Sequence, residues 1–202
     1  FRGNISTCTL MTLNVVAVSR RNFYVGNYSE CITLAKKVDK SDLKSYIQSQ
    51  TFMYRSLIRK GSIQPAIRDL EIKKLCPELN CIKIYGEYLI KQLTLEESTD
   101  KIMNLTNSCD NMPEISNILA SLIYINEQKY NSALTILERS NDLECISIYI
   151  YVLLILNRID LALGKLEKMK KIDEDNIITQ ITTCLTYLRC HEKMKEAHKI
   201  LN

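Results

Sequence analysis

The side chains that could carry chemistry in this chain are eight cysteines and two histidines. The cysteines are Cys8, Cys31, Cys76, Cys81, Cys109, Cys145, Cys184 and Cys190, and no two have Cys-x-x-Cys spacing. One group combines both residue types: Cys184, Cys190, His191 and His198. Its spacing matches no standard structural zinc site. Disulfide scaffolds are short and dense in cysteine, so we instead expect reduced, mostly buried thiols in an intracellular protein, and no metal site.

Motifs for catalysis or cofactor binding are missing from the sequence. The glycines are isolated at positions 3, 26, 61, 86 and 164, so no glycine-rich phosphate loop is present. His191 and His198 lie together near the end of the chain, where nothing suggests a Ser-His-Asp or Cys-His pair. The paired carboxylates Glu96 and Glu97 fall at an expected helix start, where the helix dipole already accounts for them. We therefore predict a protein with no catalytic residue and no cofactor.

Composition favours a folded, helical protein. The hydrophobic fraction of 46% is too high for disorder, and five Gly and three Pro leave little room for the turns of a β-protein. The 27 basic and 23 acidic residues are interleaved, which is typical of a solvated surface and not of a nucleic-acid interface. The densest basic run, 165–171, fits an exposed helix face, with a patch for an acidic partner or a membrane surface as the alternative.

The apolar runs are too short to cross a membrane. The longest, Ile148–Leu156, has about half the length that a spanning helix needs. A second run, Leu10–Val18, fits the first helix of the fold, with a short signal-peptide core as the alternative.

A three-residue pattern recurs along the chain and predicts its second helices. A bulky residue is followed three positions later by a small residue, and four positions after that by an apolar one. The sets are Tyr28/Cys31/Ala35, Ile63/Ala66/Leu70, Leu95/Ser98/Ile102, Tyr130/Ala133/Leu137, Ile159/Ala162/Leu166 and Met194/Ala197/Leu201. The steps between their first members are about 35, 32, 35, 29 and 35 residues. The third set fits least well.

A period near 34 residues with two helices per unit is the tetratricopeptide signature. The expected first helices are 8–24, 44–60, 77–93, 113–128, 142–157 and 175–189, with prolines or acids at several starts, and with Asp142 and Asp173 as caps. The sequence thus predicts an all-α fold, a right-handed α-solenoid of about six tetratricopeptide-like helical hairpins forming a single domain over 1–202. The part played by residues 1–12 stays open, and we expect the natural chain to continue past Asn202.

The concave wall of such a solenoid is lined by the first helices, and its positions can be counted back from each second helix. The candidate partner-binding residues are Arg55, Ile58, Glu87, Ile90, Ile118, Leu122, Ile125, Ser147, Tyr151 and Thr182. The wall lacks the lysine and asparagine clamp that holds chaperone C-termini, and Glu87 should pair with Lys83 one turn earlier. It is apolar in its fourth hairpin, which suits a folded protein ligand, although Ile115, Ile118, Leu122 and Ile125 fit ordinary packing between hairpins equally well.

Three blocks of residues resemble the epsilon subunit of coatomer, the COPI vesicle coat. The first runs from Arg21 to Tyr28 and continues with Cys31-Ile32 and Ala35-Lys36-Lys37-Val38. The second is Phe52, Tyr54-Arg55 and Glu87-Tyr88-Leu89. The third is Leu143-Glu144-Cys145, Leu153-Leu154, Arg158 to Ala162, Lys165 to Met169, Asp173-Glu174-Asp175 and Thr179-Gln180. The similarity covers about Val18 to Leu201. Phe1 to Thr12 match nothing in the family, 94–111 match weakly, and the last third of a typical family chain is absent.

The resemblance implies a non-catalytic coat subunit that curls around the C-terminal domain of the coatomer alpha subunit and stabilises it. Its other coatomer partners would be indirect, and no nucleic acid is implied. The implied location is the cytoplasm, peripheral on the Golgi membrane and on COPI-coated vesicles through the coat, in retrograde Golgi-to-ER and intra-Golgi transport. The alternatives are another tetratricopeptide scaffold, such as a chaperone or motor adaptor, and a helical-repeat protein that binds single-stranded RNA.

Overall fold

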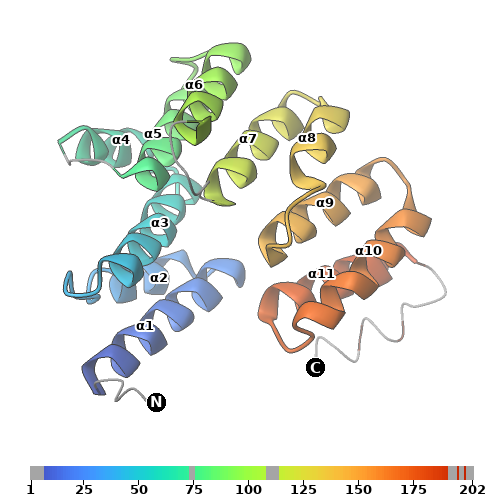
Figure 1. Ribbon diagram of the computed structural model, residues 1–202, viewed down its shortest axis with the longest axis horizontal. Helices are drawn as coiled ribbons and strands as arrows, with labels where there is room; N and C mark the ends of the chain where they lie inside the picture. The colour runs from blue at the N-terminus through green and yellow to red at the C-terminus, as the bar shows by residue number, and fades with distance from the viewer. Residues whose placement is uncertain (1–6, 73–75, 108–113, 191–194, 196–197, 199–202) are drawn as a thin grey trace. The chain divides into compact units, whose positions relative to one another are not determined.

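The computed structural model describes residues 7–72, 76–107, 114–190, 195 and 198. Within these residues the chain forms helices and no strands, as Figure 1 shows. The helices are α1 (Thr7–Tyr24), α2 (Tyr28–Ala35), α3 (Leu43–Arg59), α4 (Ile63–Ile72), α5 (Pro77–Leu89), α6 (Leu95–Asn107), α7 (Glu114–Asn126), α8 (Tyr130–Leu137), α9 (Leu143–Ile155), α10 (Ile159–Ile172) and α11 (Ile177–Arg189). None of them is long and apolar enough to span a membrane. The all-α prediction is confirmed.

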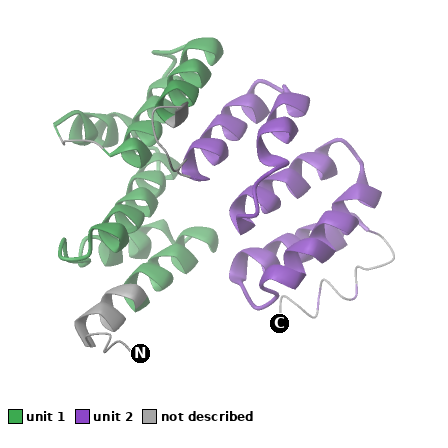
Figure 2. Cartoon of the chain, viewed as in Figure 1, with its two compact units in different colours: residues 1–110 green, residues 111–202 purple. Residues whose placement is uncertain are grey.

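The helices group into two compact units, residues 1–110 and residues 111–202 (Figure 2). In the first unit, α3 packs on the α1–α2 hairpin and α5 packs on the α3–α4 hairpin. In the second unit, α9 packs on α7–α8, and α11 packs on α9–α10. The predicted stacking of helical hairpins is therefore confirmed within each unit. That the whole chain forms one domain stays a prediction, and the sixth second helix (Met194, Ala197, Leu201) lies outside the described residues.

In the five sets that the structure describes, the small residue is buried between the two helices of its hairpin. Cys31, Ala66, Ser98, Ala133 and Ala162 are all fully or almost fully buried, and so are the apolar residues four positions later. A larger side chain at such a site would push the two helices apart, which in a packed core costs about 1–3 kcal/mol. The third set, which fitted the pattern least well, is as tightly packed as the others, since Ser98 and Ile102 are fully buried.

Each first helix from α1 to α9 ends in the same turn, in which one residue adopts a left-handed conformation. These residues are Gly26 (φ 83°), Gly61 (φ 83°), Lys91 (φ 61°), Gln128 (φ 57°) and Asn157 (φ 57°). After α1, Gly26 N–H donates to the Phe23 carbonyl at 3.1 Å and Asn27 N–H donates to the Asn22 carbonyl at 2.8 Å. Equivalent bonds recur after the other four helices. This is the Schellman motif, which satisfies the last carbonyls of a helix and reverses the chain.

Side-chain caps begin several helices. Asp142 accepts hydrogen bonds from the backbone N–H groups of Glu144 and Cys145, which confirms its predicted role. The prediction for Asp173 is wrong: Asp173 ends α10, and Asn176 caps α11 by accepting from Ile178 N–H. The reason is that Asp173 still donates its own N–H to Met169 and so belongs to the preceding helix. Residues 174–176 then form the connection, and α11 starts two residues later than expected.

We expect Gln128→Gly to raise the free energy of unfolding by about 0.5–1 kcal/mol, because glycine removes the steric cost of the left-handed conformation. Gly61→Ala should act in the opposite direction and lower it by about 1 kcal/mol, because its Cβ would introduce that cost. Urea unfolding followed by circular dichroism measures both. Destabilisation by Gln128→Gly would show that the turn does not hold this residue in the left-handed region.

Candidate protein-binding surface

Burial divides the ten candidate partner-binding residues into two groups. Arg55, Ile58, Ile118 and Thr182 are buried, and their side chains pack inside their own unit. Glu87, Ile90, Leu122, Ile125 and Ser147 are partly exposed, and Tyr151 is 51% exposed. In the fourth hairpin, formed by α7 and α8, Ile115 and Ile118 are both buried, so ordinary packing accounts for these two side chains. The candidates that stay accessible to a partner are therefore those of the second group, two of them in the first compact unit and four in the second.

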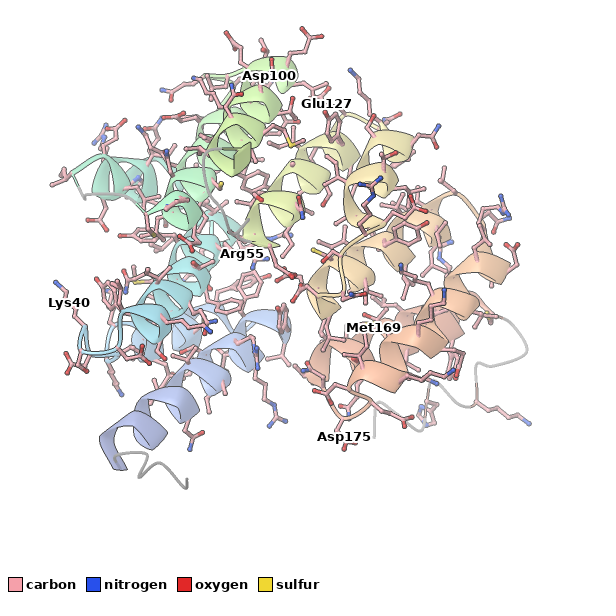
Figure 3. All side chains as sticks on the ribbon, viewed as in Figure 1. Lys40, Arg55, Asp100, Glu127, Met169 and Asp175 are labelled. Carbon is pink, nitrogen blue, oxygen red and sulfur yellow. The ribbon has the colours of Figure 1, made fainter. Side chains whose placement is uncertain are left out.

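Arg55 lies in an aromatic cluster formed by α1, α2 and α3 (Figure 3). Its guanidinium carbon is 4.5 Å from the centre of the Phe23 ring and 5.7 Å from that of Phe52. The rings of Phe23, Tyr24, Tyr28 and Phe52 contact one another with centres 5.5–6.0 Å apart. A cation over aromatic faces is attracted by their negative π-systems. Arg55 therefore joins the first two hairpins, which is a structural role that counting positions along the helix did not reveal.

A hydroxyl chain joins α9 to α11. Thr182 donates its hydroxyl proton to the Ile178 carbonyl at 2.7 Å. Its Oγ1 lies 2.7 Å from Ser147 Oγ, so Ser147 is the donor in that second bond. Tyr151 lies one turn after Ser147 on α9, outside this hydrogen-bonded contact, and half of its surface is exposed to solvent. An exposed tyrosine on a rigid helix has the size and the polar tip of an interface anchor.

A cavity of about 430 Å³ lies between α5 and α6 in the first unit. It is lined by Asn80, Lys83, Ile84, Glu87, Lys101, Asn104 and Leu105. Lys83 Nζ is 3.4 Å from Glu87 Oε1, as predicted, and 3.8 Å from Glu71 Oε1 on α4. The sequence predicted Glu87 on the wall and its pairing with Lys83. It did not reveal that α6 contributes Lys101 and Asn104, because only first helices were expected to line that wall.

Glu114, Asp142 and Cys145 bring three potential metal ligands within 4.8 Å of one another. Ser140 donates to Glu114 Oε2 at 3.3 Å, while Asp142 Oδ2 accepts from the Glu144 and Cys145 N–H groups at 2.9 and 3.1 Å. Burial raises the pKa of the Cys145 thiol to about 12, and burial together with the Asp142 charge raises the pKa of Glu114. The thiol thus stays protonated at neutral pH, and Asp142 already serves as a helix cap.

Of the predicted cysteine and histidine group, Cys184 is buried in α11 and Cys190 follows the end of that helix. His191 lies outside the described residues, so the structure does not test whether the four residues meet. The buried Cys31, Cys81, Cys145 and Cys184 are free thiols, as expected.

The family model described as the coatomer epsilon subunit matches residues 14–202. Coatomer subunit epsilon of Caenorhabditis elegans is 24% identical over 179 residues, which cover 88% of this chain and 61% of the relative. Coatomer subunit epsilon of Dictyostelium discoideum is 25% identical over 199 residues, covering 93% of this chain and 65% of the relative. The chain therefore spans less than two thirds of the length of these relatives.

Among solved structures, a thermophilic TPR protein of Thermus thermophilus is similar in fold. It superposes with a TM-score of 0.60 at 14% identity, over 88% of this chain and 99% of the other. This likeness supports the tetratricopeptide fold.

We expect the purified protein to bind no zinc, because the candidate ligands are a protonated thiol, a carboxyl group with a raised pKa and a carboxylate engaged as a cap. After incubation with zinc and dialysis, metal analysis should find no retained equivalent, and a chelator should leave the helical circular dichroism unchanged. One retained equivalent that Cys145→Ser abolishes would contradict this and locate the metal in the cluster.

Proposed function

Because the chain belongs to the coatomer epsilon subunit family, we propose that it is a non-catalytic structural subunit of the COPI vesicle coat that binds the coatomer alpha subunit. The proposed binding site on that partner is its C-terminal domain, which the chain would stabilise. In this role it acts in retrograde Golgi-to-ER and intra-Golgi vesicle transport. It is cytoplasmic, and it reaches Golgi membranes and COPI-coated vesicles only through the coat.

The family match over residues 14–202 is the observation that carries this proposal. The helical hairpins agree with it, because stacked hairpins present long, rigid surfaces that suit binding to another protein. The second unit offers an anchor on such a surface: Tyr151 is half exposed on α9, next to the joint between Ser147 and Thr182. Leu122 and Ile125 on α7 are partly exposed and would widen the apolar contact. Glu87 and Ile90 are the corresponding residues of the first unit.

We expect this chain and an isolated C-terminal domain of the alpha subunit to elute together on gel filtration. Tyr151→Asp should weaken the complex by about tenfold or more, because a carboxylate would replace a central aromatic anchor at the interface. Leu185→Asp on α11 is the matched control, since Leu185 is 49% exposed against 51% for Tyr151. Leu122→Asp tests α7 in the same way. Titration calorimetry measures the affinities, and circular dichroism verifies the helix content.

Separate elution of the two proteins at micromolar concentration would count against the proposed partner. An unchanged affinity of Tyr151→Asp would remove Tyr151 from the interface while leaving the partner in place. Loss of helix in a variant would assign that residue to the core of its unit.

A further inference from the structure

The first two hairpins carry the positive charge of the chain. Residues 1–72 hold 11 basic and five acidic residues, a net charge of +6, whereas residues 73–202 hold 16 and 18, a net charge of −2. Helices α1 and α3 contain no acidic residue, and the single acid of α2, Glu30, lies in its first turn. Such an asymmetry between parts of a chain points to a polyanionic partner.

The segment that joins α2 to α3 gathers part of this charge around one exposed aliphatic side chain. We call it the basic loop, and its exposed members are Lys36, Lys37, Lys40, Leu43 and Lys44. Leu43 is 66% exposed. Lys40 extends outward from this connection, away from the helices (Figure 3). We propose that the basic loop contacts the anionic surface of a lipid bilayer, with its lysines on the headgroups and Leu43 inserted between them.

Two aspartates of the same segment are engaged by hydrogen bonds from other groups and do not pair with its lysine side chains. Asp39 accepts the backbone N–H of Lys40 at 2.6 Å. Asp42 accepts the backbone N–H of Lys44 at 3.2 Å and the hydroxyl of Ser45 at 2.6 Å, and so caps α3. None of the four lysines of the basic loop is in an ion pair with any residue that the structure describes. The loop thus keeps a net charge of +2, and its ammonium groups can reach lipid phosphates.

The other lysine-rich stretch of the chain, 165–171 on α10, lacks this combination. Lys165 lies over the ring of Tyr149, with its Nζ 4.8 Å from the ring centre. Lys170 Nζ donates to the Tyr187 hydroxyl at 2.9 Å and lies 3.6 Å from Glu167 Oε1. The three residues that follow α10 are all acidic. Two of its four lysines are therefore held within their own unit, and the stretch has no excess of positive charge.

Leu43 favours a bilayer over a nucleic acid as the polyanion. It is the first residue of α3, so the start of a capped helix holds it in place. Single exposed aliphatic residues are common on protein surfaces. One that lies among lysines supplies both contributions to interfacial binding, which are attraction to anionic headgroups and burial of apolar surface beneath them. A nucleic-acid backbone would use the lysines alone.

This contact goes beyond the proposed coat function and does not depend on it. A net charge of +2 and one aliphatic side chain bind a bilayer too weakly to recruit the chain without help, because stable attachment takes stronger or combined signals. The basic loop would add to an attachment that the coat has already made. Recruitment through the coat is therefore unchanged.

The test is co-sedimentation of the full chain with vesicles of phosphatidylcholine alone and with vesicles that also contain about 30% phosphatidylserine. The partition coefficient should be at least about fivefold higher for the anionic vesicles. The double variant Lys37→Gln/Lys40→Gln should lower it by about fivefold. Its matched control is Lys168→Gln/Lys171→Gln, which removes the same charge from exposed lysines of α10 and should leave the partition coefficient unchanged.

A second variant tests insertion at constant charge. Leu43→Ser should lower the partition coefficient for anionic vesicles by about threefold, because it removes the apolar group that enters the headgroup layer. Leu185→Ser is its matched control, since Leu185 is 49% exposed on α11, a helix without lysine. Circular dichroism verifies that every variant keeps its helix content.

Equal binding to both kinds of vesicle, or an equal loss in the two double variants, would overturn the proposal. Binding that Leu43→Ser leaves unchanged would also overturn it. If a single-stranded RNA of about 20 nucleotides then bound through the same lysines, the basic loop would be reassigned to nucleic acid. The alpha-subunit complex is measured separately through Tyr151 in the second unit, so failure of one proposal is distinguishable from failure of the other.

Discussion

The structure depends on reversing the chain within a few residues after each of the first helices α1, α3, α5, α7 and α9. One residue takes the left-handed conformation, and two backbone bonds return to the end of the helix. In four hairpins, the small residue five positions after this turn allows the second helix to cross closely, as Cys31 does after Gly26 and Ala162 does after Asn157. This fixed spacing links the left-handed residue of the turn to the small residue at the helix crossing. A bulky residue at the crossing would therefore also displace the start of the second helix.

The third hairpin shows how the same constraint is met with a longer connection. Its left-handed residue is Lys91, but the small residue is Ser98, seven positions later, because 90–94 form a longer loop. Here the start of α6 is fixed by a capping box instead: Glu97 N–H donates to Thr94 Oγ1 at 3.3 Å, and Thr94 N–H donates to Glu97 Oε2 at 2.9 Å. The third set, which fits the pattern least well, thus has hydrogen bonds that fix its helix start, and Ser98 is still buried.

The sequence was sufficient to predict the hairpins, because the spacing of the bulky, small and apolar residues can be recognised within one short stretch of sequence. It did not predict which wall residues reach solvent, since that depends on how closely neighbouring first helices pack. Arg55 and Thr182 lie on the predicted face and yet are buried. Arg55 packs on the Phe23 ring of α1, and Thr182 is hydrogen-bonded to Ser147 of α9. The left-handed turns at Lys91 and Gln128 were also missed, because these side chains carry none of the preference that glycine or asparagine signals.

Two surfaces of different chemistry follow from one repeated hairpin. Along α9, hydroxyl groups complete the packing against α11, so the aromatic side chain of Tyr151 is the group left for an apolar contact. Between α5 and α6, polar residues line the cavity, and Lys83 is paired with Glu87 and with Glu71 of α4. The surfaces belong to different compact units, each with its own buried residues. Substitutions in one should therefore leave the other's local structure intact and combine additively, unless a single partner engages both.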